Sequence, residues 1–380
     1  MSEGPSEGVD WRSYGDATET FSTGDSASSE PDYPQRPPVF PQVGGAVGVS
    51  RETASGDVSR ETRASWQPRT AADIAVQDND FDDHGTPLAQ AAQHSVLART
   101  GGLRRQGVAR PDATRVLVVA NQKGGVGKTT STVNVAAGLA QLGQKVLVID
   151  LDPQGNASTA LGIDHHRGVP STYDMVVEGR PLADVMSECA DLPGLWVVPA
   201  TIDLAGAEIE LVSVVAREQR LARAIDAHPL VGSAAEVGED RFDYVFVDCP
   251  PSLGLLTLNA LVAGREMFIP IQAEYYALEG LGMLLETVEM VRQHLNPGLT
   301  ISTILLTMYD ARTRLASGVA DEVRSHFGDQ VLRTAVPRSV RVSEAPSYGQ
   351  TVMTYDPASA GALSYLEAAR EIATKGAPPA

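Results

Sequence analysis

The sequence predicts an α/β fold with a mostly parallel, doubly wound sheet, preceded by a long disordered N-terminal tail. Three observations support this prediction. From residue 115 onward, short runs rich in β-branched residues alternate with stretches of helical length. Residues 1–114 lack that alternation and are rich in Ser, Gly, Pro, Asp and Glu. Hydrophobic residues make up 43% of the 380-residue chain, which is enough for a substantial core.

These observations divide the chain into a tail, residues 1–114, and a globular domain, residues 115–380. A segment with the composition of the tail cannot bury enough apolar surface to offset its ordering entropy. Its 17 acidic and 10 basic side chains give it a net charge of −7. One stretch, residues 86–100, has Leu88, Ala92 and Val96 at helical spacing. It is either a transient helix or a docking motif, for which a polar scaffold protein is a candidate partner.

Within the domain, each apolar run predicts a strand and each longer stretch predicts a helix. The strands are expected at residues 115–120, 145–150, 195–200, 243–248, 267–272, 301–307 and 331–337. The helices are expected at residues 129–142, 205–227, 253–264, 278–294, 313–327 and 359–374. Helical connections between apolar strands imply a parallel sheet covered on both faces. A ligand is then expected at the carboxyl ends of the strands.

The first predicted strand leads directly into "NQKGGVGKTT", residues 121–130, and then into a helix. This context is that of a phosphate-binding P-loop. Glycines allow backbone N–H groups to turn toward phosphate oxygens, and the N-terminus of the helix adds its dipole. Gln122 replaces the glycine that usually opens the motif, and a second lysine, Lys123, follows it. Since the chain has only four lysines, two of them in one loop indicate a function for both.

The loop resembles the deviant Walker A motif, K-G-G-x-G-K-[ST], of the ParA/MinD class of P-loop ATPases. The resemblance implies ATP and Mg²⁺ as cofactors and an ATP-dependent homodimer. In that class the later lysine, here Lys128, serves its own ATP, whereas the earlier one, Lys123, reaches the ATP of the partner subunit. The residues expected to bind the nucleotide are Gly124, Gly125, Val126, Gly127, Lys128, Thr129, Thr130 and Asn156.

Two further strands of the domain end in carboxylates. Asp150 and Asp152 follow the second predicted strand, and Asp248 ends the strand in "FDYVFVDCPP". The family resemblance assigns Asp152 to positioning or activating the attacking water, which makes it catalytic together with Lys123 and Lys128. Asp248 resembles the Walker B carboxylate that holds a magnesium-bound water. The expected metal site therefore consists of Thr129, Asp152 and Asp248.

Two stretches near the C-terminus, "TMYDARTRLASGVADEV" and "VPRSVRVSEAPSYGQTVMTYDP", resemble the chromosomal (Soj-type) ParA partition ATPases. The resemblance covers residues 115–374. It implies chromosome segregation, with an ATP-bound dimer on nonspecific DNA and a ParB-type centromere-binding protein that stimulates hydrolysis. The arginines that bind DNA in that family fall on Arg312 and Arg341. Residues 312–341 carry six arginines and three acids, a local charge of +3.

Other functions are less compatible with the sequence. The formal net charge of −18 excludes a uniformly basic nucleic-acid binder, so DNA contact requires a local patch. A MinD-like membrane-positioning ATPase is the alternative function, but the C-terminal "AAREIATKGAPPA" is too short and too rich in Ala and Pro to hold a bilayer. An iron–sulfur ATPase needs clustered cysteines, and only Cys189 and Cys249 are present. The absence of a signal-peptide pattern favours a cytoplasmic protein, and the resemblance to the ParA family implies association with the nucleoid.

The tail contains a repeated pentapeptide, VSRET, at residues 49–53 and 58–62. VSRET can be encoded by a palindrome, gtttcacgtgaaac, that resembles the ParB-binding centromere site. One hypothesis is that both copies are translated binding sites, tolerated because a disordered tail accepts almost any sequence. The other is a short duplicated linker. The codons of the gene distinguish the two hypotheses.

Overall fold

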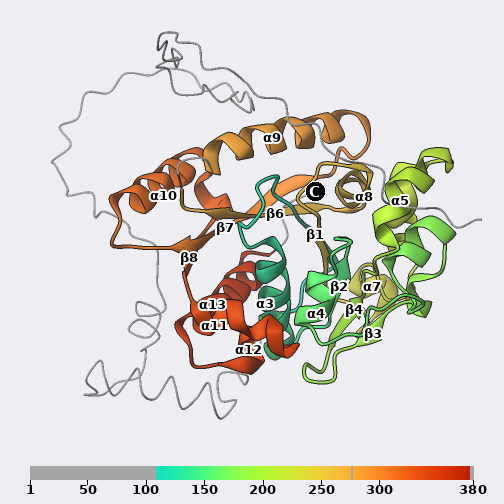
Figure 1. The fold of residues 1–380 in the computed structure, drawn as a ribbon, viewed down its shortest axis with the longest axis horizontal. Helices are drawn as coiled ribbons and strands as arrows, with labels where there is room; N and C mark the ends of the chain where they lie inside the picture. Colours follow the sequence, from blue (N-terminus) through green and yellow to red (C-terminus); the bar gives the residue numbers. More distant parts are fainter. Residues whose placement is uncertain (1–107, 275–276, 377–380) are drawn as a thin grey trace, which may run out of the picture. The chain divides into compact units, whose positions relative to one another are not determined.

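The computed structural model describes residues 108–274 and 277–376 (Figure 1). The helix expected at residues 86–100 and both VSRET copies lie outside the described residues. The described chain forms an eight-stranded sheet in the order β3-β4-β2-β5-β1-β6-β7-β8. The predicted fold class is confirmed, because every adjacent pair except one is parallel and helices cover both faces of the sheet.

All seven predicted strands are present, with bounds within two residues of those expected. They are β1 (Arg115–Val119), β2 (Val146–Asp150), β4 (Leu195–Val198), β5 (Tyr244–Asp248), β6 (Glu266–Gln272), β7 (Thr300–Tyr309) and β8 (Val331–Pro337). The eighth strand, β3 (Ser187–Glu188), pairs antiparallel with β4 at the edge. Its two residues are both exposed, so no apolar pattern could indicate it.

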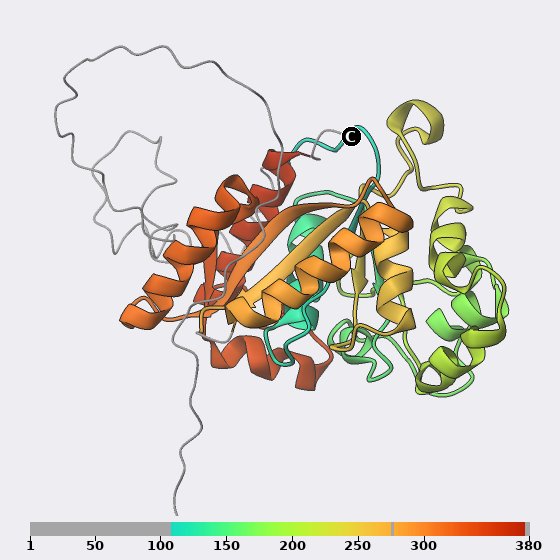
Figure 2. The ribbon, with the colours of Figure 1, turned by 90° about the horizontal axis from the view of Figure 1, so that it is seen from above.

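The helices form two layers that enclose the sheet, as the two views together show (Figures 1 and 2). One apolar layer includes residues from α5 (Leu204–Glu210), α6 (Arg220–Asp226), α8 (Leu255–Ala263), α9 (Ala277–His294) and α10 (Arg314–Phe327). The other includes residues from α3 (Lys128–Gln141), α4 (Asn156–Ala160), α11 (Val340–Glu344), α12 (Val352–Tyr355) and α13 (Ala360–Lys375). The short helix α7 (Ala234–Val237) precedes β5. The central strands β1, β2 and β5 are buried along their whole length, as expected for parallel strands covered on both faces.

The single helix expected at residues 205–227 is wrong, because the chain divides there into α5, two short 3-10 turns and α6. The helix is interrupted at the β-branched residues Val212, Val214 and Val215, because such residues have low helix propensity. Ala216 then adopts the left-handed conformation, with φ of 52°, which stops a right-handed helix.

The strand register brings the predicted site residues to one edge of the sheet. Val119, the last residue of β1, lies opposite Asp248 at the end of β5. Asp150, the last residue of β2, lies opposite Asp248 on its other side. The P-loop and both carboxylate-bearing segments therefore meet at the carboxyl ends of three adjacent strands, where open α/β sheets bind ligands.

Candidate nucleotide and DNA sites

The glycines of the P-loop hold the chain in conformations that other residues rarely adopt. Gly125 and Gly127 have φ of 75° and 86°, and Gly127 immediately precedes α3. A Cβ atom at Gly124 or Gly125 would have no neighbour within 4 Å, so the loop opens onto free space. The Thr307 hydroxyl on β7 donates to the Val126 carbonyl at 2.8 Å and fixes the loop to the sheet. The loop can thus direct its N–H groups toward an anion.

Asp248 is held by two hydroxyl groups of α3. Thr129 Oγ1 donates to Asp248 Oδ2 at 2.7 Å, and Thr132 Oγ1 donates to Asp248 Oδ1 at 2.8 Å. Asp248 is fully buried, and Lys128 is only 7% exposed. Burial lowers the pKa of Lys128, while the nearby charges of Asp248, Cys249 and Asp152 act in the opposite direction. The structure therefore brings Lys128 and Thr129 together with Asp248, the carboxylate predicted for the Walker B position.

Asp150 and Asp152 have different environments although only one residue separates them. Asp150 is fully buried and accepts hydrogen bonds from Ser158 N at 2.9 Å, Ser158 Oγ at 2.7 Å and Asp152 N at 3.2 Å. Asp152 is 8% exposed and lines the cavity described below, with one oxygen accepting from Gln154 N at 3.0 Å. Asp150 thus has a structural role in the turn, whereas Asp152 can face a bound nucleotide.

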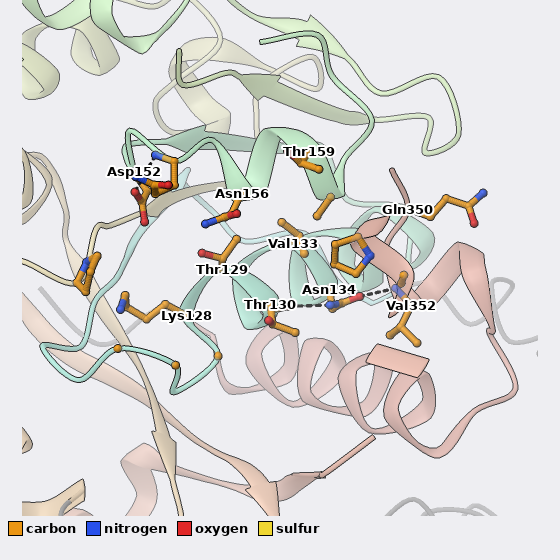
Figure 3. A pocket seen from close by; sticks show the side chains of 18 of the residues that line it. Lys128, Thr129, Thr130, Val133, Asn134, Asp152, Asn156, Thr159, Gln350 and Val352 are labelled. Atoms are coloured by element: carbon orange, nitrogen blue, oxygen red, sulfur yellow. Dashed lines mark hydrogen bonds between the residues drawn. The ribbon is translucent and has the colours of Figure 1, made fainter. Parts of the chain in front are cut away.

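A cavity of about 470 Å³ lies over the P-loop, within the usual size range of small-molecule sites. Figure 3 shows the side chains of Lys128, Thr129, Asp152 and Asn156 at one end of this cavity. Of the predicted nucleotide-binding residues, all line the cavity except Val126, whose side chain is buried. Of the three predicted catalytic residues, Lys123 alone does not line it.

The remaining residues of the cavity wall are ones that sequence reasoning did not identify. They are Val133, Asn134, Gln154, Thr159, Ala160, Pro251, Met308, Ala345, Pro346, Gln350 and Val352. Asn134 Oδ1 accepts a hydrogen bond from Val352 N at 2.8 Å, which connects α3 to α12 (Figure 3). Met308 is in the left-handed conformation, with φ of 49°, and such strain in a non-glycine residue is frequent at functional sites. No local spacing rule indicates these residues, because they come from distant parts of the chain.

The side chains present suit a magnesium ion that binds mainly to the nucleotide. No group of three His, Cys, Asp or Glu side chains suited to a metal occurs among the described residues. Mg²⁺ typically takes one or two protein oxygens, several waters and phosphate oxygens. The Thr129 hydroxyl, already in contact with Asp248, can serve as the protein ligand, with Asp248 and Asp152 accepting hydrogen bonds from metal-bound waters. The predicted set therefore fits Mg²⁺.

Burial makes the site carboxylates sensitive to pH. Burial, together with the charge of Asp150, raises the pKa of Asp248 to about 7, and burial raises the pKa of Asp150 to about 6. A carboxyl group with a raised pKa stabilises the fold fully below the unfolded value near 3.8. That contribution is lost as the pH rises through 6 and 7, because a buried negative charge then forms.

We therefore expect the nucleotide-free protein to lose stability between pH 5 and pH 8, and Asp248→Asn to lose less. The advantage of the variant over the wild type should be larger at pH 8 than at pH 5 by about 1–3 kcal/mol. Urea denaturation at both pH values measures this difference. Asp310→Asn is the control, because the pKa of Asp310 is lowered to about 2 and its charge does not change in this range. Equal advantages of Asp248→Asn at the two pH values would contradict the prediction.

Lys123 forms an ion pair with Glu274 near the end of β6. The distance from Lys123 Nζ to Glu274 Oε2 is 3.2 Å, and both side chains are partly exposed. The Lys123 backbone N–H donates to Asn121 Oδ1 at 3.0 Å, and Asn121 Nδ2 donates to the Pro270 carbonyl at 2.9 Å. The early lysine thus pairs with Glu274 and does not line the cavity of its own subunit.

The predicted arginine patch divides into two parts. Arg312, Arg314, Arg338 and Arg341 belong to the segments that follow the carboxyl ends of β7 and β8 and are all exposed. Arg333 lies near the start of β8, and Arg324 lies in the last turn of α10. Ten residues of helix, about 15 Å, separate Arg314 from Arg324. The six arginines therefore do not form a single patch, and both predicted DNA-binding arginines belong to the four that follow the carboxyl ends of β7 and β8.

The two cysteines and the C-terminal helix α13 bear on the alternative classes. Cys189 and Cys249 are buried in different apolar layers on opposite faces of the sheet, which prevents them from ligating one cluster. Among the described residues, no helix is long and apolar enough to cross a membrane. The apolar side chains of α13, including Tyr365, Leu366 and Ile372, pack in the core. They are thus not available to a lipid surface.

Comparison with known proteins agrees with this site. A family model described as an AAA domain matches residues 114–301. The chain is 49% identical over 262 residues to the sporulation initiation inhibitor protein Soj of Bacillus subtilis, covering 69% of this chain and 99% of Soj. It is 48% identical over 261 residues to the chromosome partitioning protein ParA of Caulobacter vibrioides, covering 69% of this chain and 94% of that ParA. The chain belongs to the Soj/ParA family.

Solved structures place this Soj/ParA chain among P-loop proteins. Cobyrinic acid a,c-diamide synthase from Mycobacterium smegmatis, solved with an ATP analog and magnesium, is 37% identical with a TM-score of 0.55. The match covers 67% of this chain and 93% of the synthase. Apo McdA from Cyanothece is 21% identical with a TM-score of 0.56 and shares the fold. That match covers 67% of this chain and 99% of McdA. The synthase is named for another activity, but the higher identity to Soj and ParA decides the family.

Proposed function

We propose that this chain is an ATP-dependent chromosome-partition ATPase whose ATP-bound dimer binds nonspecific DNA through Arg312 and Arg341. The observation that carries the proposal is the shared wall between the nucleotide cavity and the arginine segments. Met308 lines the cavity just before Asp310 and Arg312, and Ala345 and Pro346 line it just after the helix that carries Arg341. A nucleotide that moves this wall therefore moves both arginines.

ATP and Mg²⁺ are the cofactors, and the magnesium ion supplies charge neutralisation of the phosphates when bound. The protein residues have separate roles. The glycine loop and Lys128 hold the β and γ phosphates, and Thr129 offers its hydroxyl to the metal. Asp248 orients Thr129, at 2.7 Å, and accepts from metal-bound water. Asp152, at the cavity wall, orients the attacking water.

Lys123 gives the dimer its dependence on ATP. The side chain pairs with Glu274 rather than lining its own cavity. Two nucleotides facing each other across an interface carry many negative charges, which need cations from both subunits. Lys123 supplies one such cation to the partner's ATP. ATP binding and dimerisation then strengthen each other through this coupling.

In the partition cycle, the arginine surface of one subunit binds DNA weakly. The two surfaces of one dimer bind it together and therefore more tightly. A ParB-type centromere-binding partner stimulates hydrolysis, which dissolves the dimer and releases the DNA. The place of action is the nucleoid in the cytoplasm. The N-terminal tail offers a further contact to a polar scaffold.

The test is binding to random-sequence duplex DNA with ATP, with ADP, and with ATP after Arg341→Ala, at two salt concentrations. We expect binding that requires ATP, weakens at high salt and falls at least roughly tenfold in the variant, since two copies of the contact are lost per dimer. Arg333→Ala is the matched control, because Arg333 is exposed near the opposite end of β8.

Two results would redirect the proposal. Equal losses for Arg341→Ala and Arg333→Ala would mean that general charge, and not this surface, holds the DNA. ATP hydrolysis without DNA binding in any state would favour the membrane-positioning alternative, and anionic liposomes would be the next surface to test.

A further inference from the structure

Both arginines assigned to DNA are already paired with carboxylates of the same subunit. Asp310 holds Arg312 by two parallel contacts, from Nε to Oδ1 and from Nη2 to Oδ2, each 2.9 Å. Arg341 Nη1 lies 3.1 Å from Glu344 Oε2, and Arg341 Nε lies 3.5 Å from Asp356 Oδ2. These contacts occupy the N–H groups with which a guanidinium binds phosphate.

The neighbouring arginines of the same surface differ. Among the described residues, Arg314 and Arg338 make no ion pair within 4 Å, although both are exposed. Tyr309 on β7 lies opposite Pro337 on β8, so Asp310 and Arg338 follow adjacent strand ends. The two segments that follow these strands, residues 310–314 and 338–356, together hold four arginines and three carboxylates, which leaves a charge of +1 instead of +4. The carboxylates therefore determine how strongly this edge attracts DNA.

We infer that Asp310, Glu344 and Asp356 are affinity-determining residues that mask Arg312 and Arg341, so that one subunit binds DNA weakly and only two subunits together bind it usefully. This inference rests on the proposed DNA surface. A phosphate must compete with a carboxylate for each guanidinium, and the competition reduces affinity equally for every base sequence. Because the mask weakens DNA binding by one subunit, tight binding depends on the dimer. If the four arginines were unmasked, with a charge of +4, a single subunit would not need a partner to bind DNA.

The ion pair between Asp310 and Arg312 keeps both of its charges at physiological pH. The hydrogen bonds and charge of Arg312 lower the pKa of Asp310 to about 2, so this carboxylate stays ionised well below neutral pH. Arg338 lowers the pKa further, and both guanidinium groups remain charged. Only a competing anion or a substitution can therefore release Arg312.

Asp310→Asn tests the inference, because the amide keeps the shape and one acceptor oxygen but removes the charge. Removing an exposed ion-pair partner should tighten DNA binding roughly threefold per contact. The ADP-bound form, with one surface, should gain roughly threefold, and the ATP-bound dimer, with two, should gain roughly ninefold. The gain should shrink as salt rises. Glu344→Gln is the equivalent change beside Arg341.

Fluorescence anisotropy with a random-sequence duplex measures these dissociation constants in the full-length protein. Asp240→Asn is the charge-matched control, because Asp240 forms an exposed pair with Lys145, at 2.9 Å, away from the arginine surface. It should leave DNA affinity within about twofold of the wild type. Equal gains for Asp240→Asn and Asp310→Asn would attribute the effect to net charge and overturn the mask.

The outcomes separate this inference from the proposed function. If Arg312→Ala weakens DNA binding while Asp310→Asn also weakens it, the DNA surface stands but Asp310 positions the arginine instead of masking it. If Asp310→Asn leaves affinity unchanged, the pair is too weak to mask and the inference is again overturned. If Arg312→Ala has no effect on DNA binding, the assigned DNA surface itself is wrong.

Discussion

We expect Asp152→Ala to reduce ATP hydrolysis at least roughly 100-fold while leaving ATP binding close to that of the wild type. Positioned groups that direct proton transfer or orient water typically contribute two to four orders of magnitude. Asp152 lines the nucleotide cavity with one oxygen bound to Gln154 N, so the other can face the nucleotide. It does not contact the P-loop hydroxyl groups that hold Asp248. Its removal should thus affect the reaction more than the affinity.

The measurement is phosphate release under saturating ATP, together with titration of a fluorescent ATP analogue. The variant should retain DNA binding with ATP, and that binding should persist because hydrolysis no longer ends it. Asp164→Ala, at an exposed position in the same segment of the chain, is the control and should keep the wild-type rate. A hydrolysis rate within about fivefold of the wild type would remove Asp152 from the catalytic residues.

The parts of the site that could be predicted from sequence are those with local patterns. A strand, a glycine-rich turn and a helix follow one another within residues 115–141, so composition and spacing alone indicate the P-loop. Asp152 and Asp248 follow apolar runs that predict buried strands. Because the carboxyl ends of parallel strands meet at one edge of a sheet, the sequence alone predicts both carboxylates beside the loop.

The wall of the cavity could not be predicted in this way. Val352 meets Asn134 although 218 positions separate them, and no spacing rule connects such residues. The segment at 345–352 is made of short turns whose contacts depend on the packing of α13 against α3. The prediction of a single arginine cluster was wrong for a different reason. The six arginines are close in sequence, but helix α10 separates Arg324 from Arg314 and carries it toward the other end of the sheet.

A buried ion pair between β1 and β6 could not be predicted from the sequence, because Arg115 indicates there only the start of a strand. Both side chains are at most 3% exposed. Nε of Arg115 donates to Glu266 Oε1 at 2.8 Å, and Nη2 donates to Oε2 at 2.6 Å. Nη1 donates to the Ile372 carbonyl at 2.8 Å, which connects the central sheet to the C-terminal turn of α13. Burial opposes the charge of Arg115, but Glu266 raises its pKa above the usual range.

Glu266→Gln should therefore destabilise the domain by about 3–5 kcal/mol, because it leaves a buried guanidinium without its counter-charge. Replacing both residues by methionine should cost much less, since an apolar pair avoids the desolvation of two charges. Urea denaturation of Arg115→Met, Glu266→Met and the double variant gives the coupling energy. Asp240→Asn, in the exposed pair with Lys145, should have no measurable effect on stability. If Glu266→Gln and Asp240→Asn behaved alike, the ion pair would not connect β1, β6 and α13 energetically, and apolar packing alone would hold α13 against the sheet.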